Sequence, residues 1–161
     1  MAKEIERKYL VNSDSFIAMA TECHHIVQGY LSASPRATVR IRILDDKAYL
    51  TIKGITDGCS RNEWEYEIPI DDANEMLQCQ EGLLIEKYRY IVPYEGHCWE
   101  IDKFIGINDP ESCGTPLVMA EIELQHADEQ FELPPFIGKE VTTDARYYNS
   151  SIAKSAVNNR Q

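Results

Sequence analysis

The chain has 161 residues and a net charge of −11, with 43% hydrophobic and 27% charged residues. These values are typical of one soluble globular domain, so we expect residues 1–161 to form a single domain. The acidic balance argues against a surface for duplex nucleic acid, which is usually basic. A small anionic ligand is still compatible with it, because local charge clusters matter more than the sum.

The sequence shows no targeting or membrane signal. No apolar run is long enough to span a membrane, and the N-terminus begins with charges rather than the apolar segment of a signal peptide. The five cysteines are odd in number and widely spaced, without a C-x-x-C pair, which disfavours disulfides and zinc. We therefore expect a reduced, cytoplasmic protein with no membrane partner. Its oligomeric state stays open, with a homodimer as one alternative.

Strand-like segments dominate the chain. Their β-branched and aromatic content, their alternation and their short separations favour antiparallel pairing. Asp45-Asp46 and Tyr94-Glu95-Gly96 are typical of hairpin turns. Strands are expected near residues 3–11, 26–32, 36–44, 47–55, 61–70, 85–93, 97–105 and 117–125.

Helical patterns interrupt and follow the strands, so the predicted fold class is α+β, mainly β. One helix is predicted over 13–22, after a Ser13/Asp14 cap, and another over 71–81, ending before Gly82. Residues 127–132 and 147–158 also have helical patterns, whereas 106–116 contains glycines and prolines and is predicted to be a loop.

Charged residues recur two apart along the predicted strands. Side chains alternate between the two faces of a strand, so Glu4, Glu6 and Lys8 share one face. The residues between the charged ones are mostly apolar or aromatic, which predicts a sheet with one charged face carrying both signs. The same spacing joins Arg40 with Arg42, Thr51 with Lys53, Arg61 with Glu63, Glu65 and Glu67, Lys87 with Arg89, Glu100 with Asp102, and Glu121 with Glu123.

Two architectures are compatible with such a sheet. A sandwich would bury the apolar face and leave the charges in water, which is the commoner arrangement for any single strand. A closed eight-stranded barrel would remove exposed edges and place the charges inside. Basic and acidic residues segregate by strand here, which favours the barrel. The difficulty with the barrel is that the few predicted helices are not enough to cover its apolar outer surface.

The two charge signs predict two kinds of ligand. Paired carboxylates on neighbouring strands offer oxygen ligands suited to Mg²⁺ or Mn²⁺. The alternative is that they form salt bridges with facing Arg and Lys, which is expected for one or two of Glu63, Glu65, Glu67 and Glu100. The basic residues are too many for a single carboxylate and suit a chain of phosphates. They are Lys8, Arg40, Arg42, Lys53, Arg61, Lys87 and Arg89.

Hydrolysis of a phosphoanhydride requires in-line positioning, charge stabilisation and an oriented nucleophile. One metal ion can bridge phosphate oxygens, and a second can hold and acidify the attacking water. A lysine with a depressed pKa among other cations can act as general base. Lys87 is the first candidate for this catalytic role and Lys53 the second.

An ordered set of motifs resembles one known family. Glu4-x-Glu6-x-Lys8 is the signature of the CYTH superfamily, the triphosphate tunnel metalloenzymes, and the resemblance covers essentially the whole chain. One such motif is weak, because it occurs by chance in many strands, but the ordered set is specific. The other matching segments are Gln28-Gly29-Tyr30-Leu31, Val39-Arg40-Ile41-Arg42, Thr51-Ile52-Lys53, Arg61 to Ile68, Glu86 to Tyr90, Glu100-Ile101-Asp102, Ala120 to Glu123, and Val141-Thr142 with Arg146-Tyr147.

The resemblance implies a closed eight-stranded antiparallel tunnel with a charged interior, a few outer helices and a C-terminal helix as a possible plug. It implies that the metal ions are held by Glu4, Glu6, Glu121 and Glu123, with Asp102 and Glu65 as further candidates. The triphosphate would be bound by the seven basic residues named above. Arg146 is an eighth candidate and would close one end of the tunnel.

The family includes several activities. The short chain looks most like the small stand-alone inorganic triphosphatases, which implies Mg²⁺- or Mn²⁺-dependent hydrolysis of tripolyphosphate by a metal-activated water. Thiamine triphosphatase, RNA triphosphatase, class IV adenylate cyclase and a non-catalytic polyphosphate binder are the alternatives. The sequence leaves the general base open among Lys53, Lys87 and a hydroxide held by the metal.

Overall fold

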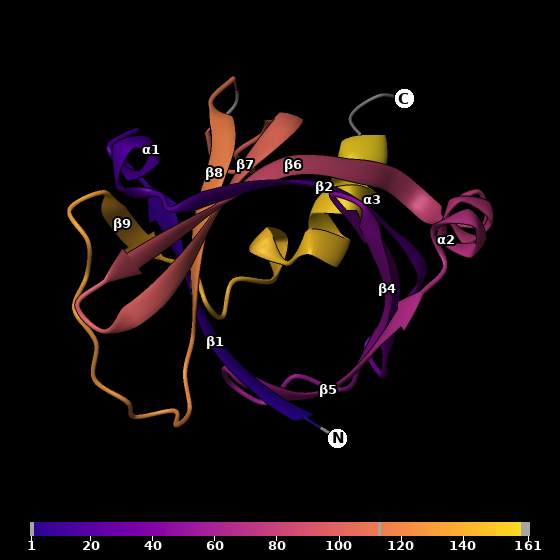
Figure 1. Cartoon of the computed structure of the whole chain (residues 1–161), viewed down its shortest axis with the longest axis horizontal. Coiled ribbons are helices and arrows are strands. Elements are labelled where there is room, and N and C mark those ends of the chain that lie inside the picture. Colours follow the sequence, from indigo (N-terminus) through magenta and orange to yellow (C-terminus); the bar gives the residue numbers. More distant parts are fainter. Residues whose placement is uncertain (1, 113, 159–161) are drawn as a thin grey trace.

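A closed ring of eight strands is the main feature of the computed structural model, which describes residues 2–112 and 114–158 (Figure 1). The strands follow the order β5-β4-β3-β2-β6-β7-β8-β1, and pairing of β1 with β5 closes the ring. All of these pairs are antiparallel. Each strand of the ring therefore has two neighbours, and the predicted eight-stranded barrel is confirmed.

The elements are connected largely by short turns. Both predicted hairpin turns are present, between β3 and β4 and between β6 and β7. Glu95 and Gly96 have φ values of 45° and 80°, as a two-residue hairpin turn requires. The elements are β1 (Ala2–Val11), α1 (Phe16–Met19), β2 (Glu22–Ala33), β3 (Thr38–Leu44), β4 (Lys47–Lys53), β5 (Ser60–Ile68), α2 (Ile70–Leu77), β6 (Glu81–Tyr94), β7 (His97–Asn108), β8 (Pro116–Glu123), β9 (Ile137–Glu140), η1 (Ala145–Tyr147) and α3 (Asn149–Asn158).

Two predicted helices are shorter in the structure. The helix predicted over 13–22 is reduced to the single turn of α1, because residues from Glu22 onward pair with β6 as the start of β2. The helix predicted over 71–81 is α2, which ends at Leu77, and β6 already begins at Glu81. In both places strand pairing extends further than the residue pattern indicated, which is the usual error at element boundaries.

The region between β8 and η1 also differs from the prediction. Residues 127–132 form no helix, and the Phe131 ring packs edge-on against Trp99 and Tyr9 instead. The short strand β9 was not predicted, and its four residues pair with β1. The pattern over 147–158 resolves into the 3-10 turn η1 followed by α3. Packing onto the barrel therefore decides the conformation of this region.

The strand register places the charged face inside the barrel. Directly opposed residues of antiparallel strands share a face, and Lys8 lies opposite Glu121 while Arg89 lies opposite Asp102. On the other face Trp99 lies opposite Ile122 and both are fully buried. The predicted inversion, with charges inside and apolar residues outside, is thus confirmed.

Two apolar clusters cover much of the outer surface. One packs beneath α1 and the segment 124–136, with Phe16 and Phe136 against the outer side of the barrel. The other lies under α2, where Ala73 and Leu77 pack on Ile41. The sequence left open what would cover this surface. In the structure, α1 and the segment 124–136 cover one part of it and α2 covers another.

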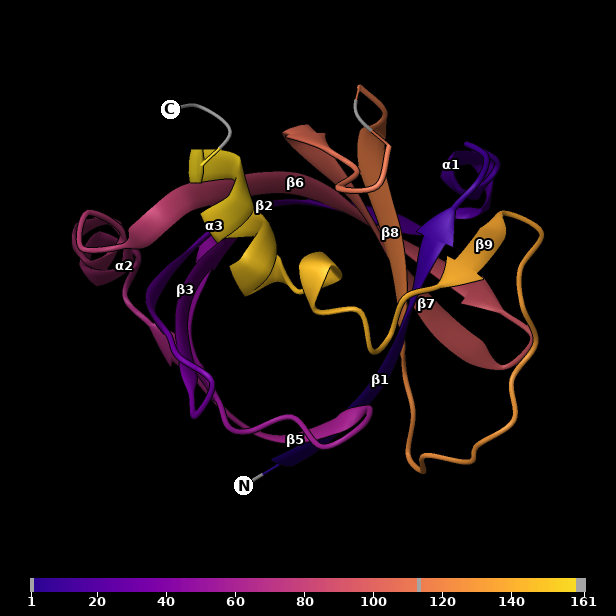
Figure 2. The same cartoon turned by 180° about the vertical axis from the view of Figure 1, so that it is seen from behind.

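The C-terminal segment closes one end of the tunnel. At that end the inward-facing residues of β6 and β8 are apolar, and Ile85 and Met119 pack in one buried cluster with Tyr147 and Ile152. Figure 2 shows η1 and α3 lying across the ring of strands. This is the place expected for a terminal plug. Among the described helices, none has the length and apolarity to cross a membrane.

Candidate active site

A polar cavity of about 390 Å³ occupies the other part of the barrel interior. Its wall carries seven acidic and seven basic side chains, together with Tyr30, Thr38, Cys98, Tyr148, Asn149 and Ser150. The acidic residues are Glu4, Glu6, Glu63, Glu65, Glu100, Glu121 and Glu123, and the basic residues are Lys8, Arg40, Arg42, Lys53, Arg61, Lys87 and Arg89.

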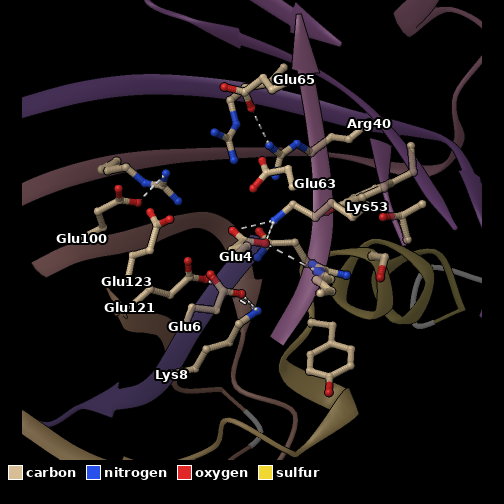
Figure 3. Close-up of a pocket in the computed structure, with 18 of the residues that line it drawn as sticks. Glu4, Glu6, Lys8, Arg40, Lys53, Glu63, Glu65, Glu100, Glu121 and Glu123 are labelled. Carbon is tan, nitrogen blue, oxygen red and sulfur yellow. Dashed lines mark hydrogen bonds and ion pairs between the residues drawn. The ribbon is translucent and has the colours of Figure 1, made fainter. Parts of the chain in front are cut away.

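One side of the cavity is mainly acidic. Figure 3 shows Glu6, Glu100, Glu121 and Glu123 gathered there, on the adjacent strands β1, β7 and β8. Two cations lie among them: Lys8 Nζ is 3.4 Å from Glu6 Oε1 and 3.7 Å from Glu121 Oε1, and Arg89 pairs with Glu100. Because residues two apart in a strand share a face, these carboxylates all point into the cavity.

The opposite side carries most of the cations. Lys53 Nζ donates to both carboxylate oxygens of Glu4, at 3.0 and 2.8 Å. Arg61 Nε lies 3.6 Å from Glu4, and an Arg40 amino group donates to the Thr51 hydroxyl at 3.2 Å. The Arg40 Nε is buried without a hydrogen-bond partner among the described residues. An orphaned guanidinium N–H in a polar cavity is a donor available to an anionic guest.

A buried ion-pair cluster lies beneath the cavity. Asp102, only 2% exposed, accepts from Arg89 Nε and Nη2 at 2.7 and 2.8 Å and from Lys87 Nζ at 2.7 Å. Burial lowers the pKa of Lys87 to about 7, although Asp102 opposes the shift. Burial alone would raise the pKa of Asp102, but Arg89 and Lys87 hold it well below its usual range. Asp102 therefore stays ionised.

The pKa values of several wall residues are shifted by burial and by neighbouring like charges. Burial raises the pKa of the Glu63, Glu100 and Glu123 carboxyls and repulsion from other carboxylates adds to it, while Lys53 and Arg89 oppose the shift at Glu63 and Glu100. Burial, together with the charges of Arg40 and Arg89, lowers the pKa of Arg42 to about 9. A cation on the acidic side and an anion on the basic side would each relieve this repulsion.

The acidic side fits a divalent cation by its chemistry. Its donors are all carboxylate oxygens, the ligands that Mg²⁺ and Mn²⁺ prefer, and within the described residues no cation pairs with Glu123. No group of three Asp, Glu, His or Cys side chains is already gathered around one point in residues 2–112 and 114–158. The reason is that Glu4 and Glu6 are turned toward Lys53 and Lys8.

Two of the predicted site residues lie outside the cavity wall. Arg146 has a side chain that is 52% exposed and is bound by Asp144 at 2.6 Å and Glu111 at 2.5 Å. Asp102 lies below the wall, and both of its oxygens are occupied by Arg89 and Lys87. Every other residue predicted for the metal or the triphosphate lines the cavity.

Several wall residues were not predicted as ligands. Glu63 and Glu100 were considered only for salt bridges, and Glu100 does pair with Arg89 at 2.7 Å. Their spacing from Glu65 and Asp102 is the signal that places them on the inner face. Tyr148, Asn149 and Ser150 come from the C-terminal segment, which no strand pattern brings to the cavity.

Comparison with known proteins gives consistent matches over the whole chain. The model of the CYTH domain matches residues 2–156. An inorganic triphosphatase of Acetivibrio thermocellus is 44% identical, over 99% of this chain and 98% of that protein, and one of Nitrosomonas europaea is 33% identical over 94% and 97%. A crystal structure described as an inorganic triphosphatase superposes with a TM-score of 0.64, at 30% identity and 95% coverage of both chains.

Proposed function

The chain belongs to the CYTH domain family, and on that premise we propose that it hydrolyses inorganic tripolyphosphate to phosphate and pyrophosphate with a divalent cation. The observation that carries the proposal is the closed cavity with seven cations and seven carboxylates facing each other. Similarity over the full length to two inorganic triphosphatases favours this activity over those of a cyclase, a thiamine triphosphatase or a non-catalytic binder.

The basic side of the cavity supplies the binding site for the phosphates. Guanidinium groups match phosphate oxygens with two-pronged hydrogen bonds, and Arg40 and Arg42 are neighbours on the inner face of β3. The remaining contacts in our proposal come from Lys8, Lys53, Arg61, Lys87 and Arg89. Arg146 and its surface ion pairs are left out of this set because it does not line the cavity.

The cation site in this proposal takes its ligands from both sides of the cavity. Glu6, Glu121 and Glu123 of the acidic side and Glu4 of the opposite side would hold Mg²⁺ or Mn²⁺, with Glu65 as a further ligand, whereas Asp102 serves Lys87 and Arg89 instead. When bound, such a cation polarises phosphate oxygens and acidifies the attacking water. The carboxylates and the basic residues line one cavity, which supports a cation site beside the phosphates.

Lys87 is the general base that the geometry favours. Its neutral amine would accept a proton from the attacking water, while the water oxygen bonds to a terminal phosphorus and the bridging P–O bond breaks toward pyrophosphate. Its lowered pKa makes the neutral form available near pH 7. Lys53 is the second candidate: burial lowers its pKa too, and its amine is held by both oxygens of Glu4.

The value of kcat/KM is expected to rise with pH through about 7, because only the neutral form of Lys87 accepts a proton. Below the pKa the amine is protonated and the rate falls tenfold per pH unit; above it the rate levels off. The measurement is phosphate release from pH 5.5 to 9. In Lys87→Arg, which stays charged throughout, the small residual rate should not show this rise, and a rise that persists there would assign it to another group.

A substrate panel tests the proposed function itself. Tripolyphosphate, ATP and thiamine triphosphate are incubated with the protein and Mg²⁺ or Mn²⁺, and the products are identified. We expect phosphate and pyrophosphate from tripolyphosphate, no cyclic AMP from ATP, and no turnover after a chelator removes the cation. Turnover of ATP or thiamine triphosphate at a higher kcat/KM than tripolyphosphate, or no turnover with either cation, would refute the proposal.

We also propose that the protein works in the reducing cytoplasm. Cys23, Cys59, Cys79 and Cys98 are all free thiols, as a reducing compartment favours. Cys113 lies outside the described residues. The homodimer considered from the sequence stays a prediction.

A further inference from the structure

A buried chain of hydrogen bonds joins the first residue of α3 to Lys87. Asn149 Oδ1 accepts from Lys87 Nζ at 2.9 Å and from Gln28 Nε2 at 3.0 Å. Gln28 is fully buried, and its Oε1 accepts from Arg42 Nε at 3.3 Å. Two amides thus lie between the guanidinium of Arg42 and the amine of Lys87, in the interior of the barrel.

Only one orientation of the two amides satisfies these contacts. Arg42 can only donate, so Gln28 must turn its oxygen toward Arg42 and its NH₂ group toward Asn149. Asn149 must then present its oxygen, which is the acceptor that Lys87 requires. Reversing either amide would place two donors face to face. Gln28 therefore fixes the orientation of Asn149.

The arrangement also fixes the direction of the Lys87 amine. Besides its bond to carbon, the Lys87 amine nitrogen has three tetrahedral positions, and each carries either a hydrogen or a lone pair. Asp102 and Asn149 take two of them, at 2.7 and 2.9 Å. One position remains for a guest in the cavity, and its direction follows from the other two. This holds whether the amine is charged or neutral.

We propose that Asn149 is a positioning residue, held by Gln28, that aims the free position of Lys87 at the reacting phosphate or water. The inference rests on the proposed hydrolysis and adds to it two residues outside the set of candidate ligands and catalytic groups. Misplacing a reacting group by about 1 Å costs on the order of 100-fold in rate, so loss of Asn149 should lower kcat far more than it raises KM.

A purely structural role for Asn149 can be separated from this one. Asn149 is the first residue of α3, and its side-chain oxygen accepts from Lys87 and Gln28. Serine is well tolerated at the start of a helix. The serine hydroxyl lies one bond closer to the backbone than the amide oxygen, so Asn149→Ser keeps a small polar residue there but loses the reach to Lys87. Asn149→Asp keeps an oxygen at the required distance. Ser151→Ala, on the same helix and away from the cavity wall, is the matched control.

Steady-state kinetics on tripolyphosphate provide the first test. We expect kcat to fall roughly 10- to 100-fold in Asn149→Ser with KM changed less than about threefold. Asn149→Asp should recover most of the loss on the high-pH plateau of the rate, where kcat is compared because the added carboxylate raises the pKa of Lys87. Thermal unfolding of Asn149→Ser and Ser151→Ala should match that of the wild type. An Asn149→Ser enzyme with more than half the wild-type kcat would overturn the proposal.

A second readout is independent of turnover. Lysine side-chain protons held in hydrogen bonds away from water exchange slowly, so the Lys87 Nζ should give an ¹⁵N–¹H signal in the wild type that is missing in Lys87→Met. We expect this signal to persist in Asn149→Asp and to vanish in Asn149→Ser. An unchanged signal in Asn149→Ser would overturn the proposal. Failure of the proposed hydrolysis would appear as inactive wild type with the signal pattern intact.

Discussion

Replacing Lys87 by methionine is expected to reduce kcat for tripolyphosphate at least 10³-fold, because it removes a phosphate ligand and the proton acceptor together. The side chain is 1% exposed, lines the cavity and is paired with Asp102. Methionine retains most of the volume of the lysine side chain. The measurement is single-turnover phosphate release at saturating cation, which separates chemistry from substrate binding.

The fold of this variant should persist. Asp102 keeps both of its contacts with Arg89 when Lys87 is removed, so no buried charge is left unpaired. The melting temperature is therefore expected to stay close to that of the wild type. Lys103→Met, an exposed lysine on β7, is the matched control and should leave kcat unchanged. A Lys87→Met enzyme that keeps a tenth of the wild-type rate would remove Lys87 from the mechanism.

Asp102→Ala is expected to destabilise the protein by about 3–5 kcal/mol, which corresponds to a fall of about 10 °C in melting temperature for a chain of this length. The substitution leaves Lys87 without its carboxylate partner and Arg89 with only Glu100, in a site that solvent barely reaches. Unpaired buried charges cost much more than the loss of an exposed ion pair. Urea unfolding followed by circular dichroism measures the effect.

Two companion variants define the origin of this loss. Asp128→Ala removes an exposed carboxylate from the segment after β8 and should change the unfolding free energy by less than about 0.5 kcal/mol. Adding Lys87→Met to Asp102→Ala removes one of the two stranded cations and should restore part of the stability. If Asp102→Ala unfolds at the same urea concentration as the wild type, the cluster beneath the cavity is not a structural ion pair.

The barrel could be predicted because its strands repeat a simple alternation. The two-residue spacing of Glu4, Glu6 and Lys8 fixes which side chains share a face. Strand register then brings Glu6 and Lys8 opposite Glu123 and Glu121, and Glu4 opposite Arg61. The segment around Phe131 could not be predicted in the same way. Its conformation depends on an aromatic contact with Trp99, more than 30 residues away, rather than on local pattern.

The same distinction applies to the site. The sequence pattern predicts which residues face the barrel interior. It does not predict how far along the tunnel each residue lies, and this position separates Asp102 from the glutamates of the cavity wall. Asn149 belongs to a helix whose docking into the barrel end depends on buried residues such as Tyr147 and Ile152. The hydrogen bond between Asn149 and Lys87 joins positions 62 residues apart, and one sequence by itself carries no record of such a contact.

The cavity wall carries as many basic as acidic side chains, so their charges balance one another. An anion that draws Lys53 away from Glu4 weakens the pairing of that carboxylate, and a cation that binds Glu4 takes the carboxylate away from the Lys53 ammonium. When both ions enter, ion pairs within the wall are replaced by ion pairs between the wall and the bound ions, with no change in net charge. Each guest therefore strengthens the retention of the other, and by thermodynamic reciprocity the tunnel favours the neutralised complex over either free ion.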